Sequence, residues 1–327
     1  MSFIESTKTY SGRDLENIFF RPMLCGPTAQ DLGVRILYNM PNSTTVQIWD
    51  GKNNVLQRYT KAGWNGGKVS VKGQRTIALE RVKAELGFSA ADYFSMVYEQ
   101  LMNRSGMSID DLSGTELEQA ETELFKRAIA ESIRVTMWMG NMDAEEGFTT
   151  FNGFLKSVVD YAESGYCGTA TYSSAELDSE DGVIKIFESM WENSDNHLKD
   201  LKGEGQLAIY VTSDIYHAYE KYLDRKGVDS AYTEMVNGRQ ALAYHGIPVI
   251  DLHINAYLIE QDEFPHSFCL LTDRRNLVLA VNTADFPGTE VRMWYNPDLM
   301  ENRQRATFMA GCQILDERIL TFAQLVG

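Results

Sequence analysis

The sequence has no long apolar run and no sign of a leader peptide. No stretch approaches the roughly 18 consecutive apolar residues of a membrane-spanning helix, and the N-terminus, MSFIESTKTY, lacks the basic and apolar regions of a signal peptide. We therefore expect a protein that is made and kept in a cytoplasm-like setting and has no membrane partner.

Cysteine is scarce and dispersed. The four cysteines, Cys25, Cys167, Cys269 and Cys312, are far apart and form no CxxC pair, which disfavours a disulfide or zinc framework. A nucleophilic role for Cys167 or Cys269 needs an activating base, and no neighbouring sequence supplies one. The pattern predicts reduced, mostly buried thiols without redox chemistry.

Basic residues are few relative to acidic ones. Lys and Arg number 30 against 46 Asp and Glu, a formal net charge of -16, so the surface as a whole repels phosphate backbones. Residues 52–83 are locally basic, with Glu80 as the one acidic residue, and we interpret this stretch as the solvated face of a hairpin. The composition disfavours sequence-specific nucleic-acid binding.

Catalytic signatures are missing as well. The sequence contains no GxGxxG, Walker A, GxSxG or HExxH motif. A two-histidine, one-carboxylate metal site is conceivable at His245, Asp251 and His253, because Asp251 and His253 share a face of a predicted strand. Such combinations recur by chance, and the alternative is the polar face of a half-buried strand, with His245 in the turn before it. We therefore expect no enzyme activity and no cofactor.

An acidic cluster lies in the middle of the chain. It lacks the alternating ligand positions and the closing glutamate of a calcium loop. We expect it to form the first turn of a helix, where carboxylates meet the helix dipole favourably. The cluster comprises Glu176, Asp178, Glu180 and Asp181.

The first quarter of the chain predicts extended structure. With 327 residues and 44% hydrophobic content the chain can bury a substantial core, yet residues 1–42 show no sustained helix or strand period and predict an arm. From 44 to 83, strand-like segments are separated by Asp50-Gly51 and Asn65-Gly66-Gly67, which is typical of hairpins. Because residues 50–75 have too few apolar side chains for a core, this ribbon needs another surface to lie on.

Two capping signatures predict helices. Ser89 with Asp92, and Ser113 with Glu116, have the spacing of a capping box. The second helix is expected to continue from 114 to 139, which is ~39 Å at 1.5 Å per residue. Its apolar stripe predicts that Leu124 and Ala128 face a sheet.

Beyond Gly140 the pattern mixes strands and helices. Domain boundaries are expected near 165–175 and 284–290, which makes the middle piece an insertion into the first domain. Ser213 is placed to cap a helix there. The expected elements are a helix near 176–193, a strand at 207–212 with a helix following it to 223, a strand within 244–254, and strand-like runs at 276–283, 291–297 and 305–322.

In this order the elements resemble the major capsid proteins of tailed bacteriophages. The phrases that carry the resemblance are TMWMGN (136–141), LAIYVTSDIYHAYEKYL (207–223), LAYHGIPVIDL (242–252), NLVLAVNT, VRMWYNP and RATFMAGCQI. The resemblance spans nearly the whole chain and rests on element order. It implies an α+β fold with an N-terminal arm (1–42), an extended β-hairpin loop (43–83), a peripheral domain with a long spine helix (84–165 and 285–327) and an inserted axial α/β domain (166–284).

The resemblance also implies a function. The chain would be a structural protein that self-assembles through pentamers and hexamers into an icosahedral shell around phage double-stranded DNA, built in the host cytoplasm and located in the virion. Portal and scaffolding proteins would be partners, and the arm begins almost at Met1, which predicts a separate scaffold or none. Two alternatives are an encapsulin-like compartment shell, which shares the fold, and a soluble metal-dependent enzyme using His245, Asp251 and His253.

The expected intersubunit contacts lie on the arm and the ribbon. Both segments are too polar and extended to bury themselves, so we expect them to be stabilised on neighbouring subunits. Some members of the family cross-link a loop lysine to an asparagine of a neighbour, and Lys61, Lys68 or Lys72 could serve, although lysines on an exposed ribbon are ordinary. The expected contact residues are Phe19, Phe20, Trp49, Arg58, Trp64, Lys68 and Lys72.

Overall fold

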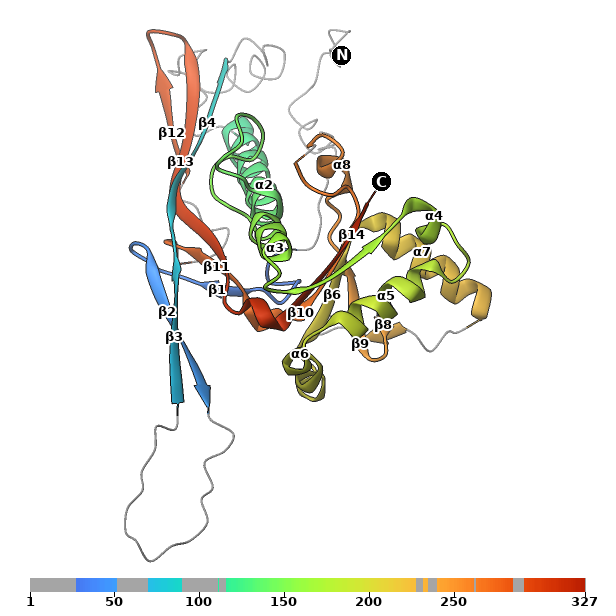
Figure 1. The fold of residues 1–327 in the computed structure, drawn as a ribbon. Coiled ribbons are helices and arrows are strands. Elements are labelled where there is room, and N and C mark those ends of the chain that lie inside the picture. Colours follow the sequence, from blue (N-terminus) through green and yellow to red (C-terminus); the bar gives the residue numbers. More distant parts are fainter. Residues whose placement is uncertain are drawn as a thin grey trace, which may run out of the picture.

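The computed structural model gives an elongated molecule with a projecting ribbon (Figure 1). It describes residues 28–51, 70–89, 111, 116–227, 232–234, 240–261, 263–284 and 291–326. Residues 1–27 of the expected arm and the helix expected after Ser89 and Asp92 lie outside these residues. Residues 28–42, also expected as arm, are instead part of the body, where Ala29 and Leu32 are buried in the core. No helix among the described residues is long and apolar enough to cross a membrane.

A seven-stranded mixed sheet forms one half of the body. Its central strands carry continuous apolar sequence because helices and loops cover both faces of the sheet. Two strand pairs, β14 with β5 and β6 with β9, are parallel, and the remaining pairs are antiparallel. In spatial order the strands are β5 (Gly168–Tyr172), β14 (Leu320–Leu325), β10 (Phe268–Asp273), β6 (Leu207–Val211), β9 (Ile247–Asp251), β8 (Gln240–Tyr244) and β7 (Tyr232–Glu234).

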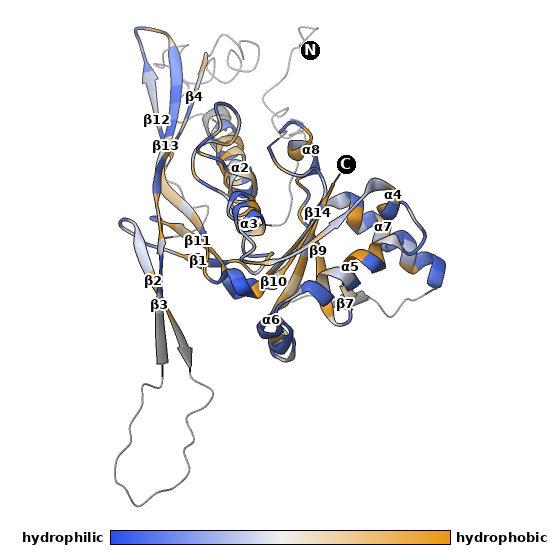
Figure 2. Ribbon diagram, in the orientation of Figure 1, coloured by the Kyte–Doolittle hydropathy of each residue, from blue (hydrophilic) through white to orange (hydrophobic). Residues whose placement is uncertain are grey.

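The faces of this sheet contribute to different cores. Along β6, Leu207, Ile209 and Val211 pack with α5 (Gly182–Asn193) and α7 (Ser213–Lys226). The alternate residues Ala208 and Tyr210 point to the other face and join the core that contains the long helix α2. Figure 2 shows that the central strands are hydrophobic and that the outer faces of the helices are hydrophilic. The short helices around it are α4 (Ser174–Leu177), α6 (Asn196–Asp200), η3 (Leu201–Glu204), α8 (Asn255–Leu258), η5 (Arg274–Asn276) and η6 (Glu317–Ile319).

A five-stranded sheet forms the other half of the body. Its strands are β1 (Arg35–Leu37), β11 (Leu277–Val281), β13 (Glu301–Ile314), β12 (Val291–Asn296) and β4 (Glu80–Ser89), and both β12 and β4 pair with the outer part of β13. Along β13 the even-numbered positions Ala306, Phe308 and Ala310 are buried in the core shared with α2. The period of two puts the alternate positions on the opposite face.

The long helix is present as α2 (Glu116–Met139), 24 residues that pack beside this sheet, and α3 (Phe154–Glu163) lies next to it. Its buried stripe runs through Phe125, Ile129 and Ile133. Leu124 and Ala128 are half-buried, so the sequence placed the centre of the stripe one residue too early. Phe125, Ile129 and Ile133 form the centre of the stripe.

The two sheets do not separate at the expected domain boundaries. The expected run at 305–322 is two strands, because β13 ends at Ile314, the chain crosses through η6, and β14 joins the seven-stranded sheet. Conversely β11, expected within the inserted domain, pairs with β13 in the five-stranded sheet. One apolar core, containing residues of both sheets and of α2, therefore continues through the body.

Two local expectations need correction. The helix expected at 176–193 is divided into α4 and α5, because a capping box of Ser173 and Glu176 starts α4 and the chain turns before Gly182. A Cβ at Gly182 would lie 1.7 Å from the Glu176 carbonyl oxygen, so the turn needs glycine there. At α7 the N-cap is Thr212, without a side-chain cap bond, and Ser213 instead donates a hydrogen bond to Asp251.

The ribbon consists of β2 (Thr44–Gly51) and β3 (Ser70–Ile77), which pair in register over their whole described length. It forms a separate two-stranded sheet that projects from the body (Figure 1). This confirms the hairpin that the sequence predicted. β4 begins at Glu80 and continues past residue 83, so the body sheet starts inside the stretch expected to be loop.

Candidate assembly surfaces

The base of the ribbon is buried in the body. Ile77 is fully buried and Leu79 nearly so, and they pack with Val278 and Ala280 on the face of the five-stranded sheet opposite α2. Gly311 on β13 allows this approach, because a Cβ there would lie 1.9 Å from the Ala78 carbonyl oxygen. The chain between β3 and β4 is therefore held tightly against β13.

Arg75 adds a polar connection at the same place. Its Nε donates a hydrogen bond of 3.2 Å to the Leu315 carbonyl oxygen, and its guanidinium forms an ion pair with Glu317. Both acceptors lie where the chain crosses from β13 to β14. A side chain on the ribbon thus contacts the link between the two sheets.

Beyond its base the ribbon has little to bury. Thr45, Gln47 and Thr76 are exposed, and Val46 and Ile48 are half-buried. A two-stranded ribbon of this kind is marginal by itself in water. Its described end, where Gly51 pairs with Ser70, lies far from the body core (Figure 1).

The expected contact residues are only partly within the described structure. Trp49 on β2 pairs in register with Lys72 on β3, so these two positions are brought together on the ribbon. The others lie outside the described residues: Phe19, Phe20, Arg58, Trp64 and Lys68, together with Lys61.

The long helix is connected to the seven-stranded sheet through a buried cation that the sequence analysis missed. Arg134 donates from Nη1 to the Leu252 carbonyl oxygen at 2.7 Å and forms a two-pronged ion pair with Glu131. The Tyr257 hydroxyl on α8 donates to the same Glu131 carboxylate at 3.1 Å. A lone arginine in the apolar run IRVTMWM was the sequence signal for this connection.

The candidate metal site does not form. Asp251 is buried and its carboxylate accepts from the Ser213 hydroxyl at 2.8 Å and the His253 amide at 2.9 Å. His253 Nδ1 lies 3.2 Å from Asp251, but its side chain is largely exposed. His245 is exposed in the turn before β9, and the strand itself, roughly 13 Å long, separates this turn from Asp251. The described residues hold no group of three or more metal-ligating side chains, and His245, Asp251 and His253 are not brought together as one site.

The described cysteines are free thiols. Cys269 is buried, and Cys167 and Cys312 are half-buried. Burial raises the pKa of the Cys167 thiol to about 11 and that of Cys269 well above its ordinary value. Thiols with raised pKa values are poor nucleophiles at neutral pH, in line with a packing role.

Comparison with known proteins identifies the fold. No family model and no curated protein matches the sequence. Among solved structures, the capsid of Myoviridae phage XM1 matches with a TM-score of 0.56 at 11% identity, over 98% of this chain and 100% of that one. A chain from Gordonia phage Cozz gives a TM-score of 0.57 at 9% identity, over 94% and 89% of the two chains. The capsid of an empty GTA particle gives 0.55 at 12% identity, over 94% and 93%. This chain therefore has the mixed α+β fold of phage and GTA capsid proteins.

Proposed function

We propose that this chain is a major capsid subunit that self-assembles into an icosahedral shell around phage double-stranded DNA. The observation that carries the proposal is the fold, which matches capsid chains over nearly their whole length. The projecting ribbon supports it, since a two-stranded element that extends from a buried base is suited to lie on a neighbouring copy. The partners are further copies in pentamers and hexamers, with portal and scaffolding proteins, and the location is the virion.

We propose a division of the subunit that follows the sheets. The arm is 1–27, because residues 28–42 pack on the body and include β1 of the five-stranded sheet, and the extended loop runs from 43 to about 79, where β4 begins. The peripheral domain contains α2 and the five-stranded sheet, and the axial domain contains the seven-stranded sheet. Trp49 and Lys72 are proposed as intersubunit contacts because they pair in the outer part of the ribbon.

Electron microscopy of the expressed chain, alone and together with a candidate scaffolding protein, tests the assembly. Closed shells of uniform size, or rings that build them, are expected. A strictly monomeric species at high concentration under both conditions would contradict the proposal. Nuclease-resistant DNA in particles from infected cells separates a phage shell from an encapsulin-like compartment, which would hold protein cargo instead.

Removal of residues 52–69 tests the ribbon. Gly51 and Ser70 are register partners, so an Asn-Gly turn can join them as a two-residue hairpin. The subunit should stay folded because Ile77 and Leu79 still bury the ribbon base. Shells should fail to form or become fragile. Shells of normal size and stability from this variant would exclude the ribbon as an intersubunit loop.

A further inference from the structure

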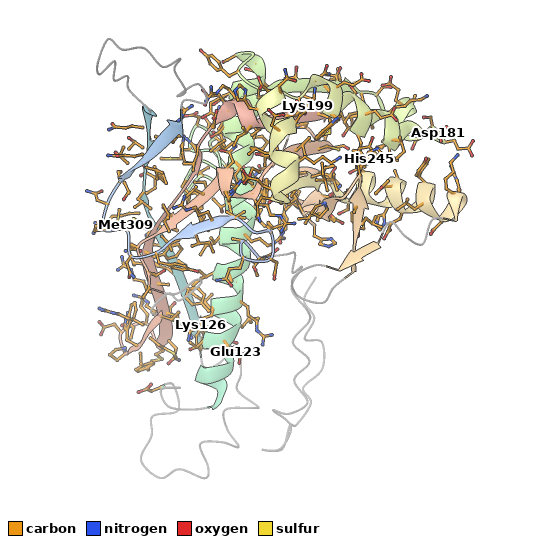
Figure 3. All side chains as sticks on the ribbon, turned by 90° about the horizontal axis from the view of Figure 1, so that it is seen from below. Glu123, Lys126, Asp181, Lys199, His245 and Met309 are labelled. Carbon is orange, nitrogen blue, oxygen red and sulfur yellow. The ribbon has the colours of Figure 1, made fainter. Side chains whose placement is uncertain are left out.

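The outer face of the five-stranded sheet is unusually basic for so acidic a chain. It is the face of β13 opposite α2, and the strand registers place β4 and β12 residues beside it in cross-strand rows. Met309, near the inner end of this face, lies on the opposite side of the molecule from Asp181 (Figure 3). We call this the basic sheet face, defined by Arg81, Lys83, Arg292, Arg303 and Arg305.

One row of this face breaks a packing rule. Arg305 on β13 has Arg292 directly opposite on β12 and Glu85 directly opposite on β4. Like charges directly opposite in a sheet destabilise it, and exceptions to local rules concentrate at functional positions. Arg305 Nε lies 3.4 Å from Glu85, which also binds Lys83 at 2.9 Å. One carboxylate thus faces more than one cation.

The next row contains a hollow. Arg303 lies between Trp294 on β12 and Gly87 on β4, and the missing side chain of Gly87 leaves a hollow of about 460 Å³. Trp294 is 42% exposed, although it is the kind of side chain that proteins usually bury. Besides Trp294 and Arg303, its lining includes Glu85, Gly87, Glu301 and Arg305.

The lining of the hollow suits a protein side chain. Arg303 lies 3.1 Å from Glu301 and Arg305 lies 3.4 Å from Glu85, so paired charges surround the exposed Trp294 ring. The hydrogen bond from Lys83 lowers the pKa of Glu85, which keeps this carboxylate ionised. Tryptophan and arginine around a pocket are the residues that contribute most to protein interfaces. A peptide surface can offer both an apolar side chain for the hollow and carboxylates for the surrounding arginines.

We propose that the basic sheet face binds a second copy of this chain, which inserts a side chain over Gly87 and presents carboxylates to Arg303 and Arg305. Charge complementarity identifies the occupant. The chain has a net charge of -16 although this face carries five basic residues, so the remainder of each copy is net negative and complements it. The proposal rests on the proposed shell function and names a surface through which the copies would associate.

Filling the hollow tests the proposal without loss of structure. Within 4 Å, a Cβ at Gly87 would meet only Glu301 Oε2, at 3.8 Å, so the backbone of β4 accommodates a side chain there, and the rest of the Gly87→Leu side chain would enter the hollow. The subunit concentration needed for assembly should rise at least tenfold. Gly203→Leu is the matched control. Nothing lies within 4 Å of a Cβ there, and Gly203 lies in η3, directly before β6 of the seven-stranded sheet. Assembly of Gly87→Leu at the wild-type concentration, or equal loss in both variants, would overturn the proposal.

A photo-crosslinking residue in place of Trp294 identifies the occupant directly, in shells or in concentrated solution. Products that join two copies of the chain support the proposal. Crosslinks confined to one chain, to nucleic acid or to a different protein overturn it. Crosslinking between copies does not require closed shells. Shells that form without this crosslink would overturn the proposed contact alone, and a crosslink without shells would support the contact while contradicting the shell function.

Discussion

Arg134 on α2 donates a hydrogen bond of 2.7 Å from Nη1 to the carbonyl oxygen of Leu252, directly after β9. The residues are far apart in sequence, and the bond joins the long helix to the seven-stranded sheet. The Arg134 side chain is 4% exposed and that of its ion-pair partner Glu131 is 10% exposed. A buried charge in this position is stable only while each of its partners remains.

Removing that cation should destabilise the subunit strongly. Arg134→Met leaves the Glu131 carboxylate without its buried cation and the Leu252 carbonyl oxygen without this donor, so the free energy of unfolding should fall by about 3–5 kcal/mol. Urea denaturation of the unassembled subunit measures it. Arg127→Met is the control, since Arg127 pairs with Glu123 on the exposed side of the same helix, and its effect should stay below about 0.5 kcal/mol. Similar losses in the two variants would contradict the structural connection.

The phase of α2 makes a second prediction. Ile129→Asp places an unpaired carboxylate in the core and should cost at least ~3 kcal/mol, enough to remove most soluble folded protein. Leu124→Asp should be milder, because Leu124 is half-buried and its carboxylate can reach water. Soluble yield and circular dichroism compare the two, with exposed Lys126→Ala as the neutral control. A larger loss for Leu124→Asp would restore the phase first expected from the sequence.

Gly311 should tolerate no side chain. In Gly311→Ala the new methyl group meets the Ala78 carbonyl oxygen, which forces the ribbon base away from β13 at a cost of roughly 3 kcal/mol. Amide hydrogen exchange should rise at Ile77 and Leu79 before it rises in the seven-stranded sheet. Gly203→Ala, with open space around the new methyl group, should leave stability unchanged. Unchanged protection of the ribbon base in Gly311→Ala would show that the close approach is not needed.

Alkaline pH should destabilise the fold. Burial raises the pKa of Cys167 to about 11 and the pKa of Tyr219 to about 12, the latter helped by Tyr244 and Tyr222. In the unfolded chain these groups ionise near their ordinary values of about 8.5 and about 10. The folded state therefore binds more protons than the unfolded state in this range, and the free energy of unfolding falls as pH rises.

The stability that the fold gains by holding these two groups neutral should be complete below about pH 8.5. It should be lost as the pH rises towards 11 for the Cys167 thiol and towards 12 for the Tyr219 phenol. Urea midpoints measured from pH 8 to 11 check the slope. Tyr219→Phe should flatten the part above about pH 10. A midpoint that rises over this interval would have the wrong sign for buried neutral groups.

Local sequence determined most of the elements. Three features depend on neighbours within a few residues, and each was predicted. They are the apolar period of α2, the apolar run of β6 followed by the polar-faced α7, and the turn at His245-Gly246. The order of these elements was enough to suggest the capsid fold. Local patterns carry this information because helix and strand periods are set by the backbone alone.

Tertiary structure decided how the elements are shared between the sheets. β11 and β14 are both short strands with mostly apolar residues, and their local sequences do not predict which of the two sheets each one joins. Apolar residues occur on more than one face of α2. Which of these faces is buried was decided by the packing of the sheets against the helix. The contacts of Arg75 with Glu317 and of Arg134 with Leu252 join distant segments, and side-chain type alone does not specify such partners. Pairing over long separations is selected by the packing of the whole core, which no local period records.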